Sequence, residues 1–211
     1  MKALMTGYTW PMRLGIAALR TIIGGLFVGH GLQKLKGWFG GPGHDGTAQM
    51  LEGLGLRPGR HHATAVGVAE TAGGALLAAG LLTPLAGSML TGVMATAIRK
   101  VHAKNGLWTT KGGYEYNLTL IAAVFAIVDG GPGRLSLDRA LGIERSGPFV
   151  ATAQLAAGLA ASAAVDALSA PEPEPEPAPE PEPVEQRPYR PRFVERAEAA
   201  EREREGEPAP R

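Results

Sequence analysis

Long apolar stretches alternate with polar loops along the first four fifths of the chain. Four of these stretches cover residues 12–32, 63–82, 84–102 and 114–129. Each is about the length needed to cross ~30 Å of hydrocarbon, although the fourth is short. Four buried helices of a soluble bundle are the alternative, but soluble helices carry a polar face and these stretches mostly do not. The pattern therefore predicts an all-α, polytopic membrane four-helix bundle.

A fifth apolar stretch, residues 149–168, gives a weaker signal. It is rich in alanine and contains Gln154 and Asp166, and alanine is nearly neutral for membrane insertion. We expect a bundle over residues 1–145, followed by a fifth transmembrane or interfacial helix within residues 146–170.

Small residues recur at a spacing of four in two of the predicted helices. Gly25 and Gly29 form such a pair in the first helix, and Gly74 and Ala78 form one in the second. Rows of small residues let membrane helices approach closely. These glycines are therefore predicted to lie at helix–helix contacts.

Polar side chains from different helices are predicted to gather on one side of the membrane. The first helix ends on the side where the second begins, and Glu70 lies about 10 Å into that second helix at ~1.5 Å per residue. The third helix ends on the same side, and the fourth starts there. The residues that share this level are His30, Glu70, Arg99, His102, Glu115 and Asn117, with Gln33 and Lys34 just beyond.

Glu70 is the most informative of these residues because its depth keeps it from the surface. Ionisable groups inside a bilayer usually face the bundle interior and pair with one another, and Arg99, His102 and His30 are its candidate partners. The others have structural alternatives, since Arg99 and His102 can bind the last carbonyls of their helix and Glu115 can be a charge at a helix N-terminus. Together they favour a polar pocket.

Arg20 lies nearer the middle of the first helix. Asp129, close to the end of the fourth helix, is predicted to lie at a comparable depth. We expect these two residues to form a structural ion pair.

Composition divides the chain into two parts. The 211 residues carry a formal net charge of +1. Up to Ala170 there are 14 basic and 8 acidic residues, a net charge of +6, whereas the remainder has 7 arginines and 12 glutamates, a net charge of −5. The segment after Ala170 also holds 11 of the 17 prolines.

This remainder, residues 171–211, is predicted to be a disordered tail rich in Pro, Glu and Arg. It begins with an extended polyproline spacer over residues 171–183 and contains a short helix over residues 195–205. A docking arm for an acidic partner or anionic lipid is the alternative.

The chain lacks cysteine and a strong, clustered basic charge, and both facts restrict its possible functions. The chain has no cysteine, which excludes disulfides, thiolate metal sites and a cysteine nucleophile. The modest, dispersed basic excess gives no support for nucleic-acid binding, and we predict no metal site.

Six motifs carry a resemblance over residues 12–142. They are GHGLQKL (29–35), GWFGGPG (37–43), AETAGGALLAAGLLTPLA (69–86), IRKVHAKNG (98–106), GGYEYNLTL (112–120) and GPGRLSLDRALG (131–142). In their order and spacing the chain resembles the DoxX family, small bacterial multi-pass membrane proteins related to the DoxD-type subunit of terminal quinol oxidase and thiosulfate:quinone oxidoreductase.

The resemblance implies a four-helix bundle in the cell membrane with a redox association. It also implies that a set of residues occupies the polar positions of the family. These are His30, Gln33, Lys34, Glu70, Arg99, His102, Glu115, Tyr116 and Asn117.

The leading functional hypothesis is a quinone-linked oxidoreductase subunit. His30 or His102 would bind a quinone carbonyl, Glu70 would relay protons, and Arg99 would stabilise negative charge. Further contacts to the quinone would come from Gln33, Lys34, Glu115, Tyr116 and Asn117. No flavin motif or iron–sulfur ligand set is apparent, so a partner protein would deliver the electrons.

Three alternatives remain open. His30 and His102 could ligate a haem, but two histidines alone are a weak signal. The bundle could be a membrane scaffold that anchors soluble redox or stress-response enzymes through its loops and tail. A small-molecule carrier coupled through Glu70 is less favoured because no internal repeat is apparent. Membrane lipid and a protein partner or second copy of the chain are the expected partners.

Overall fold

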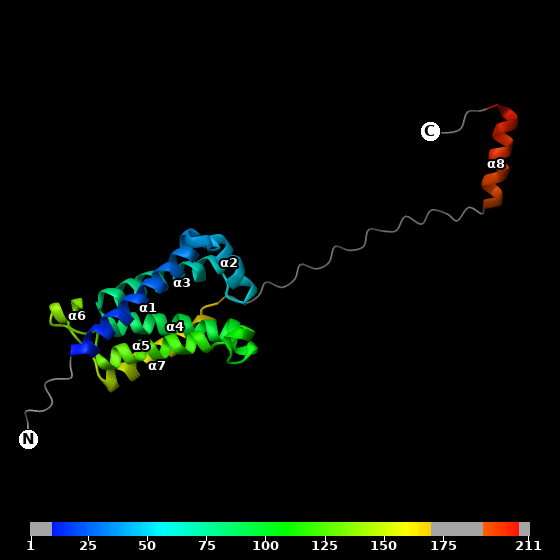
Figure 1. Ribbon diagram of the computed structural model, residues 1–211. Coiled ribbons are helices and arrows are strands. Elements are labelled where there is room, and N and C mark those ends of the chain that lie inside the picture. The colour runs from blue at the N-terminus through cyan, green and yellow to red at the C-terminus, as the bar shows by residue number, and fades with distance from the viewer. Residues whose placement is uncertain (1–9, 170–191, 207–211) are drawn as a thin grey trace, which may run out of the picture. The chain divides into compact units, whose positions relative to one another are not determined.

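The computed structural model describes residues 10–169 and 192–206, which are helical throughout apart from their connecting loops (Figure 1). The chain divides into two compact units, Met1–Glu172 and Pro173–Arg211. The helices of the first unit are α1 (Trp10–Lys36), α2 (Gly43–Gly53), α3 (Gly59–Ala79), α4 (Thr83–Ala97), α5 (Glu115–Gly130), α6 (Leu137–Ala140) and α7 (Pro148–Ala167). Shorter turns are η1 (Trp38–Gly40), η2 (Ile98–His102), η3 (Ala103–Asn105) and η4 (Thr109–Lys111). The predicted all-α class is confirmed.

The first unit consists of two layers of helices. In Figure 1, α1, α2 and α3 lie on one side, and α4, α5 and α7 lie on the other. A core of buried side chains, including Phe27, Leu77, Leu90, Val124 and Ile127, joins α1, α3, α4 and α5. We call the end that holds the α3–α4 turn and α6 the closed end. The opposite end, which holds α2 and the residues between α4 and α5, is the open end.

Glycines bring α1 and α3 into backbone contact, but they are not the glycines predicted from the sequence. A side chain on Gly24 would overlap the carbonyl oxygen of Gly74 and the backbone of Ala78. Nothing lies within 4 Å of the equivalent position on Gly25 or Gly29. Gly74 and Ala78 therefore lie at a helix contact as expected, whereas the prediction for Gly25 and Gly29 is wrong, because these two glycines face away from α3.

This contact predicts opposite effects for two neighbouring glycines. Gly24→Ala should lower the free energy of unfolding by about 1–3 kcal/mol because the new methyl group overpacks the contact. Gly25→Ala is the matched control and should be neutral or stabilising by up to about 1 kcal/mol, since alanine favours a helix. Unfolding temperatures in detergent would measure both, and a Gly25→Ala loss equal to that of Gly24→Ala would contradict this packing.

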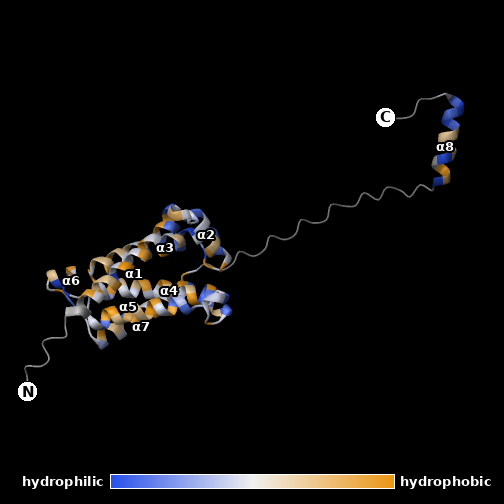
Figure 2. Cartoon of the chain, in the orientation of Figure 1, coloured by the Kyte–Doolittle hydropathy of each residue, from blue (hydrophilic) through white to orange (hydrophobic). Residues whose placement is uncertain are grey.

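Many large apolar side chains of the first unit are exposed, and hydrophobic residues make up much of its helices in Figure 2. On α1, Leu14 and Ile22 are each 62% exposed, and Leu26 follows on the same face. Two helices in the described residues, Leu14–Lys36 and Pro148–Ala167, are long and apolar enough to cross a membrane. Most of each lies at the surface, unlike the core helix of a soluble protein. α4 is shorter than the apolar stretch that predicted it, because it ends in the turn η2, whereas α5 has the predicted length and begins one residue later, at Glu115.

The polar residues that weakened the signal for α7 bind α4 and the turn η2. The buried Gln154 side-chain amide donates to Thr91 Oγ1 at 2.7 Å, and the exposed Asp166 carboxylate accepts from Arg99 and Lys100 of η2. Pairing between helices, as at Gln154, is how polar residues are accommodated in membrane helices. α7 thus packs on α4 and α5 as a further member of the bundle.

Arg20 joins the two layers at the closed end. Its Nε donates to the carbonyl of Pro132 at 3.0 Å, and its other nitrogens donate to the carbonyls of Ala78 and Leu135. The predicted pair with Asp129 is wrong, because the nearby carboxylate that interacts with Arg20 comes from Asp138 of α6. The loop after α5 folds back over the closed end and brings Asp138 there.

The second unit contains one described helix, α8 (Arg192–Glu205). It extends the predicted helix at 195–205 by three residues, and it is strongly hydrophilic (Figure 2). The spacer and the other predicted disordered parts of the tail lie outside the described residues.

Candidate functional site

The candidate site is a cavity of about 670 Å³ between the two helix layers, towards the open end. α1 and α3 form one wall, and α4, α5 and α7 form the other, while the segment from Met50 to Leu56 covers the end. Most of the lining is apolar, and it includes Phe27, Leu51, Val66, Met89, Val93 and Leu120. This volume is in the range of cavities that hold small organic ligands.

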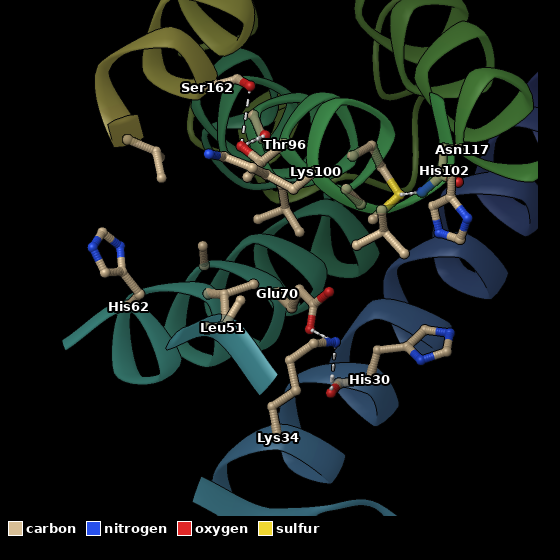
Figure 3. A pocket seen from close by; sticks show the side chains of 18 of the residues that line it. His30, Lys34, Leu51, His62, Glu70, Thr96, Lys100, His102, Asn117 and Ser162 are labelled. Atoms are coloured by element: carbon tan, nitrogen blue, oxygen red, sulfur yellow. Dashed lines mark hydrogen bonds and ion pairs between the residues drawn. The ribbon is translucent and has the colours of Figure 1, made fainter. Parts of the chain in front are cut away.

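A buried ion pair lies in the α1–α3 wall of the cavity (Figure 3). Glu70 is only 2% exposed, and its Oε2 accepts a hydrogen bond from Lys34 Nζ at 2.6 Å. Lys34 is half-buried at the end of α1. The prediction of Arg99, His102 or His30 as the direct partner of Glu70 is wrong, since the bonded cation is Lys34.

Close packing of α1 on α3 explains why Lys34 reaches Glu70. At this level a side chain on Gly31 would overlap the carbonyl oxygen of Gly67 at 2.7 Å. Lys34 lies one turn after Gly31 on α1, and Glu70 lies one turn after Gly67 on α3. The two glycines therefore bring the helix axes together where the ion pair forms.

Arg99 lies outside this cavity, contrary to the prediction. Its guanidinium donates to the Ser162 carbonyl at 2.5 Å and to the Asp166 carboxylate, both on α7. The reason is the π-helical turn η2, since i→i+5 bonding alters the directions of successive side chains relative to an α-helix. Lys100, the next residue, lines the cavity and also binds Asp166 Oδ1 at 2.5 Å.

His102 lines the second wall and is held in one orientation. Its Nδ1 donates to the carbonyl of Gly112 at 2.8 Å, which leaves Nε2 as the ring nitrogen without this bond. Asn117 is buried in the same wall and donates to Met94 Sδ at 3.3 Å. Tyr116 also lines the cavity.

The remaining predicted site residues divide between the cavity and the surface. His30 lines the cavity, although its ring is exposed and its Nδ1 donates to Gln33 Oε1 at 3.1 Å. Gln33 itself is not among the lining residues. Glu115 accepts from the backbone N–H of Thr109 at 3.0 Å and so fixes the loop before α5. The cavity therefore unites His30, Lys34, Glu70, His102, Tyr116 and Asn117, whereas Gln33, Arg99 and Glu115 lie outside it.

Sequence reasoning missed several polar lining residues. Lys100 lies between Arg99 and His102, the two residues predicted from the motif IRKVHAKNG. The π turn η2 determines that Lys100, and not Arg99, lines the cavity. Ser162 comes from α7 and hydrogen-bonds Thr96 at 3.0 Å. His62 lies at the start of α3 and bonds Ser169 at 3.2 Å. A helical wheel of α7 could have indicated Ser162, since it lies on the same face as Gln154 and Asp166.

The described residues hold no group of three or more His, Asp or Glu side chains arranged to bind a metal ion. The chemistry available in the cavity is that of hydrogen-bond donors and proton carriers: an ammonium, a carboxylate and imidazoles set in apolar walls. Such a site suits an amphiphilic molecule with oxygen atoms on a ring or headgroup.

The exposed apolar helices and the polar residues that face inward define a helical membrane protein. Residues 15–103 match the DoxX family model, which confirms the resemblance over these residues. The matched region comprises nearly all of α1 and continues through η2, so it includes Lys34 and Glu70 but neither α5 nor α7.

One relative supports the membrane assignment. The uncharacterized membrane protein Rv3486 of Mycobacterium tuberculosis is 28% identical over 149 residues, covering 63% of this chain and 88% of the relative. No solved structure matches the chain significantly.

Proposed function

We propose that the chain is a multi-pass subunit of the cell membrane that binds a quinone in the cavity and takes part in its reduction or oxidation. In this proposal α1, α3, α4, α5 and α7 all cross the bilayer. The single observation that carries it is the Lys34–Glu70 ion pair in the wall of an otherwise apolar cavity. A buried ion pair beside a ligand-sized space is a characteristic position for proton-coupled chemistry.

Two walls of the cavity offer hydrogen bonds to the two ring oxygens. On one wall Lys34 donates to an oxygen while Glu70 holds the ammonium in place. On the other, the imidazolium form of His102 donates from Nε2, because its Nδ1–H is already bound to the carbonyl of Gly112. His30, at the rim, connects the Lys34 side with solvent. Arg99 takes no part, since it binds α7.

Reduction of a quinone to a quinol consumes two electrons and two protons. Lys34, recharged through Glu70, supplies one proton, and the imidazolium of His102 supplies the other. The electrons come from a redox protein partner, because the chain has no cysteine and no apparent electron-carrying cofactor motif. In quinol oxidation the same groups accept the protons.

The test is quinone binding by the full-length chain in detergent, measured by calorimetry with a benzoquinone that bears only methyl and methoxy groups. Glu70→Gln should weaken binding about tenfold because Lys34 is no longer held by a carboxylate. Glu144→Gln is the matched control and should bind like the unsubstituted protein, since Glu144 pairs with Arg139 of α6 and does not line the cavity. Lack of binding by the unsubstituted protein would refute the proposal.

A further inference from the structure

We infer that the cavity opens sideways into the membrane between α3 and α4, at Ala65, Ala69 and Met89, and that a long hydrocarbon chain of the ligand lies in this opening. The inference rests on the proposed function and specifies its substrate class: a quinone with an apolar tail that enters from the bilayer. A water-soluble quinone would not need this route.

The opening is seen where two hollows meet. A groove of about 450 Å³ on the outer side of α3 is lined by His61, Thr64, Ala65, Val68, Ala69 and Met89. Three of these residues, Ala65, Ala69 and Met89, also line the main cavity. The groove and the cavity therefore share a boundary formed by two methyl groups and one methionine.

Packing contacts frame the opening on both sides along the helices. Towards the closed end, Gly73 lies against Leu90 and Met89, and an added side-chain carbon on Gly73 would stand 3.1 Å from Leu90. Towards the open end, Val165 of α7 packs against the cluster of Leu56 and Ala63. α3 and the second layer are thus in contact above and below the opening.

The residues at the boundary are suited to passage. Alanine side chains are too short to reach across a helix interface, and methionine is unbranched and adapts its shape to its neighbours. Met89 is half-buried, as expected for a side chain that separates two spaces. These properties allow the Met89 side chain to change its conformation and so to connect or separate the cavity and the groove.

The groove fits a hydrocarbon chain. Ala65 and Ala69 lie about 9 Å and 15 Å along α3 from Gly59 at ~1.5 Å per residue, which is the depth of lipid acyl chains when α3 crosses the bilayer. Val68, 47% exposed, faces outward beside them. The polar members, His61 and Thr64, lie near the helix start. The apolar part of the groove therefore continues the apolar cavity towards the lipid.

The experiment compares two probes on the full-length chain in nanodiscs: the tail-less benzoquinone used above and its decyl derivative. Val68→Trp should fill the groove, which Val68 lines without lining the main cavity. It should weaken decyl-quinone binding about tenfold, while tail-less quinone binding changes by less than about twofold. Ala75→Trp is the matched control, since Ala75 is exposed on the same helix and lines neither hollow. It should leave both affinities unchanged.

Equal binding of the decyl quinone by Val68→Trp and the unsubstituted protein would overturn the inference, as would an equal loss for both probes. Failure of the unsubstituted protein to bind either probe would instead refute the proposed function. If Val68→Trp does not fold, a decyl quinone with a photoreactive group at the tail end provides the second test. It should label the residues between His61 and Ala69 or Met89, and labelling confined to other helices would overturn the inference.

Discussion

Asp138→Ala should lower the free energy of unfolding by about 3–5 kcal/mol, because the substitution leaves several buried polar groups without their partner. Asp138 is 1% exposed. Its carboxylate accepts from the backbone N–H of Leu82 at 2.6 Å, from the backbone N–H of Thr83 at 2.9 Å, and from the Thr83 hydroxyl at 2.6 Å. One side chain therefore binds the first turn of α4 from 55 residues away in the sequence.

The backbone at this turn depends on Asp138. Leu82 has a left-handed conformation, with φ of 48°, which is unfavourable for a residue with a branched side chain. α4 has no capping side chain of its own at this residue. The Asp138 carboxylate supplies the cap and compensates for the conformation. It also brings negative charge near Arg20, whose three carbonyl partners tie α1 to the closed end.

Thermal unfolding in detergent would measure the loss, and we expect the unfolding temperature of Asp138→Ala to fall by roughly 10 °C. Asp129→Ala is the control, since Asp129 is the carboxylate that sequence reasoning paired with Arg20, and it is exposed. It should change the unfolding temperature little. A larger loss for Asp129→Ala than for Asp138→Ala would contradict the arrangement of the closed end.

The positions of the long helices could be predicted because apolar length is a local property. The apolar stretch at residues 63–82 corresponds to α3, and the one at 149–168 corresponds to α7, each within a few residues. Helix order also predicts that Glu70, His102 and Asn117 lie in one region, since the antiparallel order along the chain determines which helix ends share a side. Both inferences need only the sequence of each segment and the order of segments.

The directions in which side chains point from their helices could not be predicted from the sequence of each segment. A regular helix would direct Arg99 into the pocket, but the π turn η2 directs it to α7 instead. The four-residue spacing predicts Gly25 and not Gly24 at the helix contact, although only contact with α3 distinguishes the two. Asp138 was missed because its partners lie on another helix. The outcomes for Gly25 and Asp138 depend on a neighbouring helix whose rotation a single sequence does not specify.

Replacement of Lys34 should lower the free energy of unfolding far more than replacement of Glu70, its partner in the ion pair. Lys34→Met leaves the Glu70 carboxylate buried without its cation, which should cost about 3–5 kcal/mol of unfolding free energy. Glu70→Met should cost about 1 kcal/mol, because Lys34 is near the open end and its flexible chain can carry the ammonium to water. The difference arises from burial, since Glu70 is far less exposed than Lys34.

The double substitution Lys34→Met with Glu70→Met separates stability from function. It should recover most of the loss caused by Lys34→Met, because an apolar pair of similar size replaces the buried charges. Quinone binding should nevertheless remain weakened about tenfold or more, since the donors in the α1–α3 wall are gone. Arg60→Met is the control for removing a cation, because its partner Asp45 is exposed, and it should cost less than about 1 kcal/mol. A double variant that is both stable and fully able to bind quinone would show that the ion pair stabilises the bundle only, and that the cavity needs no charge to bind its ligand.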